Sequence, residues 1–190
     1  MSRSIAVERE CQHGQKILSS VQGLWLARAG AGRHGHDRPR RASKHHDHVV
    51  ATMLEFEPPL VGCVISNRNY SFSLLQATNE CVLNIPTLEI AEKVVGCGNT
   101  SGAKIDKFER FGLTPKPAAL VGAPLIEECF VNLECRVVDT GMVAKYCLFV
   151  LEVVKAWIDP AVKNPRTIHH CGNGNFMVVG EKIRLKSKMK

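Results

Sequence analysis

Long apolar runs of β-forming residues constrain this chain more than any other feature of its sequence. The longest extends from Tyr146 to Ile158 and carries Glu152 in its interior. Shorter runs cover residues 60–65 and 81–85, and each predicts a buried strand. Residues 129–137 alternate apolar and polar side chains, which predicts a half-buried strand. Several long strands with few helices predict a mainly β protein that closes, or nearly closes, into a barrel.

Short helices and one further strand complete the predicted elements. Ser71 is placed to cap a helix that ends near Asn79. A second helix, ending near Gly96, is predicted from four apolar residues that share one helical face: Leu88, Ala91, Val94 and Val95. The stretch Phe176–Ile183 predicts the last strand.

The composition of the chain changes near residue 51. Residues 27–48 contain no Ile, Leu, Val, Phe or Met and show neither helical nor strand periodicity. They hold six Lys or Arg residues against two Asp, so four of the seven net positive charges fall there. We therefore predict an atypical basic segment over residues 1–51, disordered or out of frame, and one globular domain over residues 52–190. Because the basicity is local, no specific nucleic-acid partner is predicted.

Composition also indicates the environment of the protein. No apolar run reaches the roughly 18–20 residues that would cross a bilayer, and no signal-peptide pattern opens the chain. We therefore expect a cytoplasmic protein without a membrane partner. The eight cysteines are scattered without a CxxC pair, and most lie in apolar runs, which predicts reduced thiols in the core.

Three stretches of the sequence resemble one known family. The first is Thr52–Gly62 running into Ser66–Phe72, the second is Cys81–Pro86, and the third is Gly96–Phe108 followed by Gly112-Leu113-Thr114. In order and spacing these stretches are similar to flavin reductase-like proteins, a family that includes the flavoredoxins. The resemblance implies a Greek-key split β-barrel with short helices, working as a homodimer, with FMN in a groove at the barrel edge near the subunit interface.

The resemblance also implies a set of FMN contacts. FMN needs donors for its phosphate, polar partners for the ring edge and an apolar wall for the ring face. A polar turn that leads into a helix N-terminus is a natural phosphate site, and residues 66–71 form such a turn after a predicted strand. The predicted cofactor-binding residues are Thr52, Ser66, Asn67, Arg68, Ser71, Asn84, Ser101, Gly102, Lys104 and Lys107.

Each of these residues also has a purely structural interpretation. Ser71 can serve only as a helix cap, and Asn67 and Asn69 can serve only as turn residues. Asp106 can cap a helix that starts at Lys107, with the ammonium groups of Lys104 and Lys107 left as solvated surface charges.

Other chemically suggestive residues favour structural roles. The cluster of His45, His46, Asp47 and His48 has spacing that suits chelation, but its neighbours supply no scaffold, so no metal site is predicted. The pair His169-His170 is expected in a surface loop after Pro165. Cys97 has no resolving cysteine nearby in the sequence and is expected to be structural.

These observations predict an FMN-binding, flavin reductase-like oxidoreductase. It would transfer a hydride or electrons between NAD(P)H, or a redox partner, and FMN. An NAD(P)H:flavin oxidoreductase and a flavoredoxin-type electron carrier both fit this description, and the alternative is a non-catalytic family member that has lost FMN. Because the cofactor itself reacts in such chemistry, no acid–base residue is predicted.

The segment before Thr52 departs from the family. There the resemblance calls for two strands, the second ending in a Thr-Met-Ser-Trp-like motif that lines the flavin, whereas this chain has Lys44–Ala51. Codons back-translated from that segment, with third bases that the genetic code allows, encode the peptide Asn-Ile-Met-Thr-Met-Ser-Trp when they are read one base forward. Back-translated codons from Leu26 onward, read in the same shifted frame, allow an apolar strand, a turn and a second strand without a stop codon. We hypothesise that residues from about 26 to 51 are translated out of frame; the other interpretation is a divergent natural N-terminus.

Reading the genomic DNA tests this hypothesis. We expect third-codon bases that permit the shifted reading, with one extra nucleotide upstream and one missing near the Ala51–Thr52 boundary. A stop codon, or third bases incompatible with the shifted motif, would contradict it.

Overall fold

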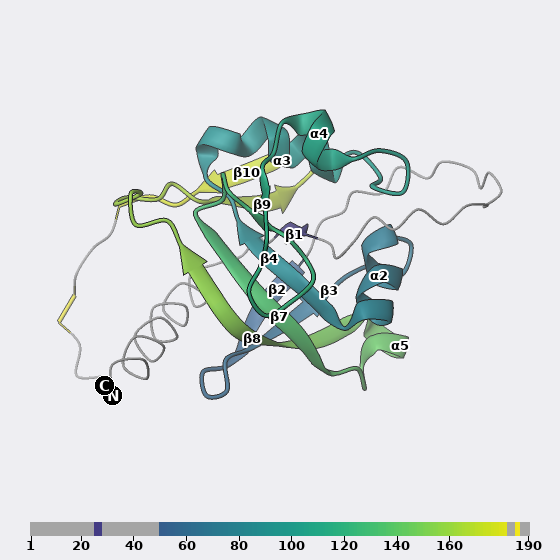
Figure 1. Cartoon of the computed structure of the whole chain (residues 1–190). Helices are drawn as coiled ribbons and strands as arrows, with labels where there is room; N and C mark the ends of the chain where they lie inside the picture. The colour runs from purple at the N-terminus through teal and green to yellow at the C-terminus, as the bar shows by residue number, and fades with distance from the viewer. Residues whose placement is uncertain (1–24, 28–49, 182–184, 187–190) are drawn as a thin grey trace.

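The main element of the structure is one six-stranded antiparallel sheet, with strand order β1-β4-β7-β8-β3-β2 (Figure 1). The computed structural model describes residues 25–27, 50–181 and 185–186. The strands of this sheet are β1 (Trp25–Ala27), β2 (Val50–Glu55), β3 (Leu60–Val64), β4 (Glu80–Ile85), β7 (Val131–Asp139) and β8 (Leu148–Ile158). The predicted strands at 60–65, 81–85 and 146–158 are confirmed as β3, β4 and β8, although Tyr146 itself ends a helix.

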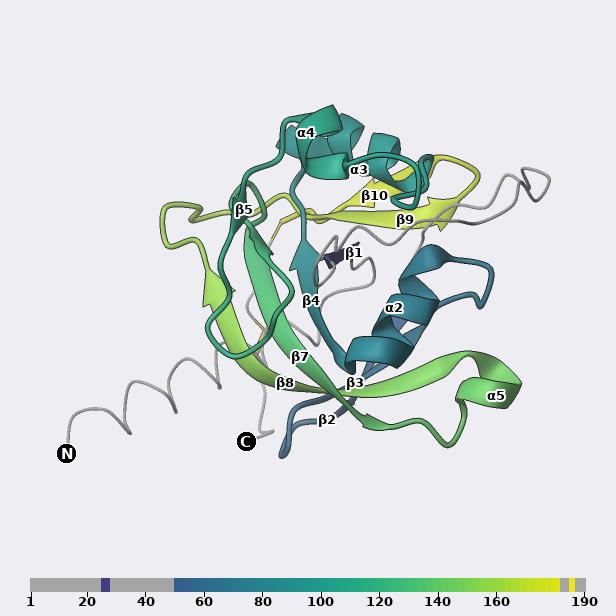
Figure 2. The same cartoon turned by 45° about the vertical axis from the view of Figure 1, so that its right-hand side comes forward.

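Short helices and two small hairpins complete the fold. The helices are α2 (Tyr70–Thr78), the 3-10 helix η1 (Leu88–Ile90), α3 (Ala91–Gly98), α4 (Lys107–Phe111) and α5 (Val143–Tyr146). The hairpin strands are β5 (Pro115–Lys116) with β6 (Leu125–Ile126), and β9 (Ile168–Gly172) with β10 (Asn175–Val178). Figures 1 and 2 show α3, α4 and the β9–β10 hairpin gathered over one end of the sheet. No helix in the described parts of the chain is long and apolar enough to span a membrane.

Two further predicted strands are present, but their bounds differ from the prediction, and the burial of the first differs as well. The strand predicted over 129–137 begins at Val131, and its first five residues are buried on both faces rather than one. Val131, Leu133 and Cys135 point into the main core, while Asn132 and Glu134 are covered by the segment that runs from 115 to 126. The strand predicted over 176–183 is shorter, because β10 covers only Asn175–Val178 and pairs with β9.

Two apolar clusters lie on either side of the sheet. The main core is built by inward-facing residues of β3, β4, β7 and β8, among them Val61, Leu83, Leu133 and Phe149. The second cluster packs residues of α3 and the 113–129 segment against Val82. Gly96 of α3 lies so close to the ring of Phe111 that an added methyl group would collide with it, which fixes how α3 and α4 pack.

β1 and β2 are the first and last strands in the order of the six-stranded sheet. β1 is the only part of residues 1–49 that the structure describes, and its three residues pair with Val82, Leu83 and Asn84 of β4. β2 begins at Val50, and the pairing of Val50 with Val64 starts the β2–β3 ladder two positions before Thr52. Of the segment hypothesised to be out of frame, about residues 26–51, residues 28–49 with the histidine cluster lie outside the described residues.

Glu134 ties the 115–126 segment to the sheet. Its side chain is 0% exposed, although it stands on a strand and carries a carboxylate. Oε1 accepts hydrogen bonds from the backbone N–H of Ala119 at 2.9 Å and from Nε1 of Trp157 at 2.6 Å. Oε2 accepts from the N–H groups of Leu120 at 2.6 Å and Val121 at 3.2 Å. Four donors therefore satisfy the buried charge, as burial of a carboxylate requires.

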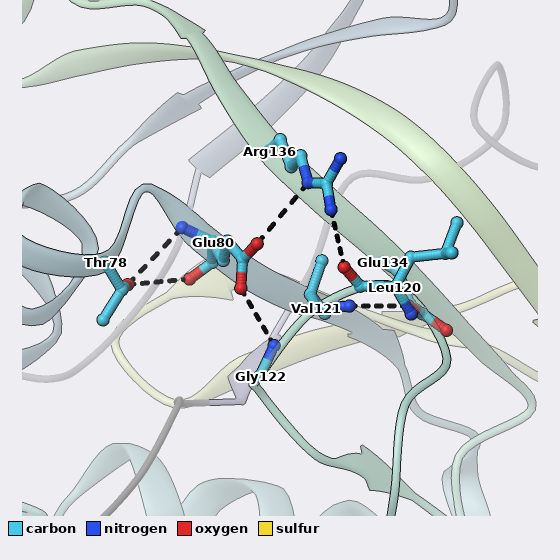
Figure 3. Close-up of polar contacts among 7 residues, drawn as sticks. All are labelled: Thr78, Glu80, Leu120, Val121, Gly122, Glu134 and Arg136. Atoms are coloured by element: carbon cyan, nitrogen blue, oxygen red, sulfur yellow. Dashed lines mark hydrogen bonds and ion pairs between the residues drawn. The ribbon is translucent and has the colours of Figure 1, made fainter.

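Two further charged residues extend this network, as Figure 3 shows. Glu80 Oε2 accepts from the N–H of Gly122 at 2.9 Å, and its Oε1 lies 3.5 Å from Nε of Arg136. Arg136 in turn donates from Nη2 to the carbonyl of Leu120 at 2.8 Å. The loop from 119 to 122 is thus held by side chains of two adjacent strands, β4 and β7.

The network makes stability depend on pH. Burial acts to raise the pKa of the Glu134 carboxyl, but the hydrogen bonds from Ala119, Trp157, Leu120 and Val121 outweigh burial and lower that pKa. A carboxyl whose pKa is lower in the folded state stabilises the fold above its unfolded pKa. That contribution is lost as the pH falls through the folded value.

We expect Glu134→Gln to lower the free energy of unfolding at pH 7 by about 1–3 kcal/mol, because the amide cannot satisfy all four donors. The difference from the unmodified chain should shrink as the pH falls below about 4.3, the ordinary glutamate pKa. Urea denaturation across this pH range measures both effects.

The matched control is Glu127→Gln, which removes an exposed ion pair with Lys116 and should cost little. If Glu134→Gln lowered the free energy of unfolding as little as the control does, or by an amount independent of pH, this would contradict a stabilising role of the Glu134 carboxylate.

Candidate functional site

The predicted phosphate-side residues form a closed turn between β3 and α2. Ser66 Oγ accepts from the backbone N–H of Arg68 at 3.3 Å, and the Ser66 carbonyl accepts from the N–H of Asn69 at 2.9 Å. The side chains of Ser66, Asn67 and Arg68 are exposed on this turn. Three of the predicted cofactor residues are therefore presented together to solvent at the start of a helix.

The prediction that Ser71 caps this helix is wrong. The N-cap position belongs to Asn69, and Ser71 lies in the first turn of α2 with its side chain buried. The reason is that the chain turns earlier than the sequence pattern suggested: the bond from Asn69 N–H to Ser66 closes the turn two residues before Ser71. No acidic residue occupies the first turn of α2, so its positive dipole end is not neutralised there.

The second predicted polar loop joins α3 to α4. Ser101 shapes it, because its carbonyl accepts from Lys104 N–H at 3.1 Å and its Oγ accepts from Ala103 N–H at 3.3 Å. Lys104 is exposed, whereas Gly102 is half-buried. Figures 1 and 2 both show this loop on the same side of the molecule as the N-terminal end of α2. The fold thus brings the two predicted polar segments to one end of the protein.

Lys107 and Asp106 have structural partners in this loop. Lys107 Nζ donates to the carbonyl of Cys97 at 2.7 Å, so its interpretation as a solvated surface charge is wrong. Asp106 Oδ1 accepts from the N–H groups of Phe108 at 2.8 Å and Glu109 at 3.3 Å, which confirms the predicted cap of α4.

Two predicted cofactor residues lie apart from these loops. Thr52 is exposed on β2 and pairs with Gly62 of β3, four residues before Ser66 in the sequence. Asn84 is fully buried in β4, where its Nδ2 donates to the carbonyl of Val82 at 3.3 Å. Neither residue belongs to the two polar segments.

The prediction of a loop at His169-His170 is wrong, since both residues lie in β9. His169 is buried, with Nε2 3.3 Å from Oγ1 of Thr167, and the ring of His170 packs edge-on against Phe176 at 5.0 Å. The signal for this hairpin was present in the sequence. Asn173 and Gly174 both adopt positive φ, as the two central residues of a tight hairpin turn require.

Five of the seven described cysteines are buried, whereas Cys147 is half-buried and Cys171 is exposed. All seven are free thiols, as predicted, and Cys97 is buried in α3; Cys11 lies outside the described residues. Burial raises the pKa of Cys63 and Cys129, and a hydrogen bond with Cys135 together with burial raises that of Cys81. These thiols stay protonated and are poor nucleophiles. Within the described ranges, His, Cys, Asp and Glu side chains form no group suited to a metal ion.

Comparison with known sequences identifies the domain. The sequence model of the flavin reductase like domain matches residues 48–175. An uncharacterised protein of Archaeoglobus fulgidus is 38% identical over 111 residues, which are 58% of this chain and 63% of that protein. An uncharacterised protein of Pyrococcus abyssi is 34% identical over 103 residues, which are 54% of this chain and 59% of that protein. The match thus spans less than two thirds of the length of either relative.

Comparison with solved structures agrees on the fold. An FMN-binding domain of a flavin reductases-like enzyme from Shewanella baltica superposes with a TM-score of 0.76 at 20% identity, covering 90% of this chain and 93% of that one. The flavoredoxin of Desulfovibrio vulgaris gives 0.71 at 18% identity with the same coverage. A Shewanella frigidimarina structure described as having a split barrel domain gives 0.68 at 16% identity, covering 93% and 92%. The chain therefore belongs to the flavin reductase-like domain family and has its mainly β, split-barrel fold.

Proposed function

We propose that this chain binds FMN, with the flavin phosphate at the turn of residues 66–71. The observation that carries the proposal is the N-terminal end of α2, which has no acidic residue in its first turn and follows a turn that exposes the side chains of Ser66, Asn67 and Arg68. Such an end favours a dianion through hydrogen bonds and through the helix dipole. Membership of the flavin reductase-like family supports the choice of FMN among phosphate-bearing ligands.

The second loop supplies the chemistry that suits the rest of the ligand. Lys104 adds a positive charge, and Ser101 adds a hydroxyl, which fits ribityl or phosphate oxygens. Lys107 also supports this loop: its ammonium group donates to the carbonyl of Cys97 and so fixes the backbone from which Ser101 and Lys104 project.

FMN bound there would supply hydride and electron transfer, and the protein would orient it and limit its contact with water. The electron source is NAD(P)H for a reductase or a redox protein for a flavoredoxin-type carrier. No side chain of the chain is assigned acid–base work in either case. The competing proposal is a non-catalytic family member that has lost FMN.

A titration of the purified chain with FMN, followed by flavin fluorescence, tests the proposal. We expect saturable quenching, a yellow protein, and tighter binding by a version whose frame is restored over residues 26–51. Bleaching by NADH would identify a reductase, and bleaching only by a redox protein would identify a carrier. Unchanged FMN fluorescence with the native chain would contradict FMN binding and favour the non-catalytic alternative.

We also propose that the chain forms a homodimer through the outer face of β2 and β3. This face exposes Val50, Leu54 and Val64 to 68%, 48% and 38%, an apolar surface on an edge of the sheet. Gly62 lies at its centre, and side chains of Leu54 and Leu148 flank the position its Cβ would take, at 3.3 and 3.4 Å. A partner copy would cover both the apolar face and the outer edge of β2.

Sedimentation of the native chain should therefore give the mass of two chains, and Leu54→Glu should give one chain because it buries a charge at the contact. Met177→Glu, which changes a similarly exposed residue on β10, is the control and should leave the dimer intact. A monomeric native chain, or a dimer that both variants retain, would contradict this interface.

A further inference from the structure

Two cysteine thiols of the main core face each other across neighbouring strands. β4 and β7 lie side by side in the sheet (Figure 1), and the register of their ladder places Cys81 directly opposite Cys135. Both side chains belong to the main apolar core, so they point to the same face of the sheet. Cys81 is 2% exposed and Cys135 is 0% exposed. The two thiols are thus close in space, although residues 82–134 separate them in the sequence.

Polar contacts show that the two sulfur atoms are neighbours. A hydrogen bond joins the thiols of Cys81 and Cys135, and this bond raises the pKa of Cys81. Sγ of Cys135 also donates to the carbonyl of Leu133 at 3.4 Å. Cys63 of β3 is the third buried thiol of this core, and its pKa is raised by burial and, to a smaller extent, by the nearby Cys81. Because β3 and β4 are not adjacent in the sheet, no strand ladder fixes the distance from Cys63 to Cys81.

The β4–β7 ladder brings the pair near the geometry of a disulfide. Residues directly opposite each other on antiparallel strands have Cα atoms about 4.5–5.5 Å apart, and disulfide-bonded cysteines have Cα atoms about 4.4–6.8 Å apart. The Cβ atoms of opposite residues are about 4.5–5.5 Å apart, against about 3.5–4.5 Å in a disulfide. A bond between Cys81 and Cys135 therefore requires the two strands to approach by no more than about 1 Å.

Burial determines when such a bond can form. Disulfides form by attack of a thiolate on another sulfur compound, and an oxidant must reach that thiolate. In the folded protein both thiols are buried, and the raised pKa of Cys81 keeps its thiol protonated. In the unfolded chain the same side chains meet water, and a small fraction of ordinary cysteine is ionised near neutral pH. The pair is therefore expected to react while the chain folds, and not afterwards.

We propose that Cys81 and Cys135 form a disulfide when the chain folds in the presence of a disulfide oxidant, and that folding then preserves whichever state, dithiol or disulfide, was present. With glutathione disulfide as the oxidant, one cysteine thiolate attacks it, a mixed disulfide forms and one reduced glutathione leaves. The second cysteine, as its thiolate, attacks the cysteine sulfur of the mixed disulfide and releases the second glutathione. The two cysteines are oxidised by two electrons, and one glutathione disulfide is reduced to two glutathione thiols.

The bond would close a covalent ring around the covering layer of the sheet. Residues 82–134 include α3, α4 and the 115–126 segment. A bond between β4 and β7 would keep this part of the chain joined at its two ends even when the strand ladder opens. It would also restrict the unfolded chain, which favours the folded state.

The test refolds the full-length chain from urea with either reduced glutathione or glutathione disulfide. Free thiols are then alkylated in denaturant, and disulfide-linked peptides are identified by mass spectrometry. We expect a peptide that links Cys81 to Cys135 after refolding with glutathione disulfide and none after refolding with reduced glutathione. In a chain that has already folded, glutathione disulfide should produce at least about 10-fold less of this peptide over the same time. Dithiothreitol should reduce the bond about 100-fold more slowly in the folded chain than in urea, because it must wait for the core to open.

The matched control is Cys63→Ala, which removes another buried thiol of the same core and should leave the bond intact. Cys135→Ala should abolish the linked peptide. If Cys135→Ala does not refold, the peptide map of the unmodified chain decides alone. A map in which Cys81 is joined to Cys63, or in which Cys81 and Cys135 stay unlinked, would overturn the proposal. Equal rates of formation in the folded and the refolding chain, or equal rates of reduction in buffer and in urea, would overturn it as well.

Discussion

The fold depends on the shielding of β7 from both sides. A central strand of a half-exposed sheet would carry polar residues outward, but here Asn132 and Glu134 meet the 115–126 segment instead of water. Asn132 exchanges two hydrogen bonds with the backbone of Ile126, and Glu134 accepts from three consecutive N–H groups. The 115–126 segment has no helix or long strand, so these side chains supply hydrogen-bond partners for its backbone. A segment that covers a core needs such partners, because buried backbone N–H and C=O groups must be hydrogen-bonded.

This arrangement also explains how the site is supported. The covering segment packs with α3 and α4 in the second apolar cluster, so the sheet, the covering layer and the polar loop after α3 form a continuous structure. On the other side of the sheet, β3 leads directly into the turn of residues 66–69. The two polar segments therefore start from elements that the two cores hold in place, as a binding site needs if its donors are to be ordered before the ligand arrives.

Sequence patterns predicted the parts of the fold in which one physical signal dominates. The apolar runs that became β3, β4 and β8 are continuous and well bounded, and Asp106 stands in the sequence context of a cap. The alternation over 129–137 predicted the wrong burial, because Glu134 looks like a solvent-facing residue in the sequence. The four hydrogen-bond donors that satisfy its buried carboxylate are distant in the sequence. The N-cap of α2 was assigned to Ser71 instead of Asn69, because the hydrogen bond from Asn69 N–H to Ser66 that closes the turn is visible only in three dimensions.

The loop after α3 is fastened at both ends, and this limits what binding can cost it. Thr100 Oγ1 donates to the carbonyl of Gly96 at 2.9 Å, and Lys107 Nζ donates to that of Cys97 at 2.7 Å, so both ends are anchored to the last turn of α3. Only the middle of the loop is left to adjust. Little backbone entropy then remains to be lost on binding, so for the proposed FMN ligand a substitution at Lys107 is expected to weaken affinity through disorder of the loop.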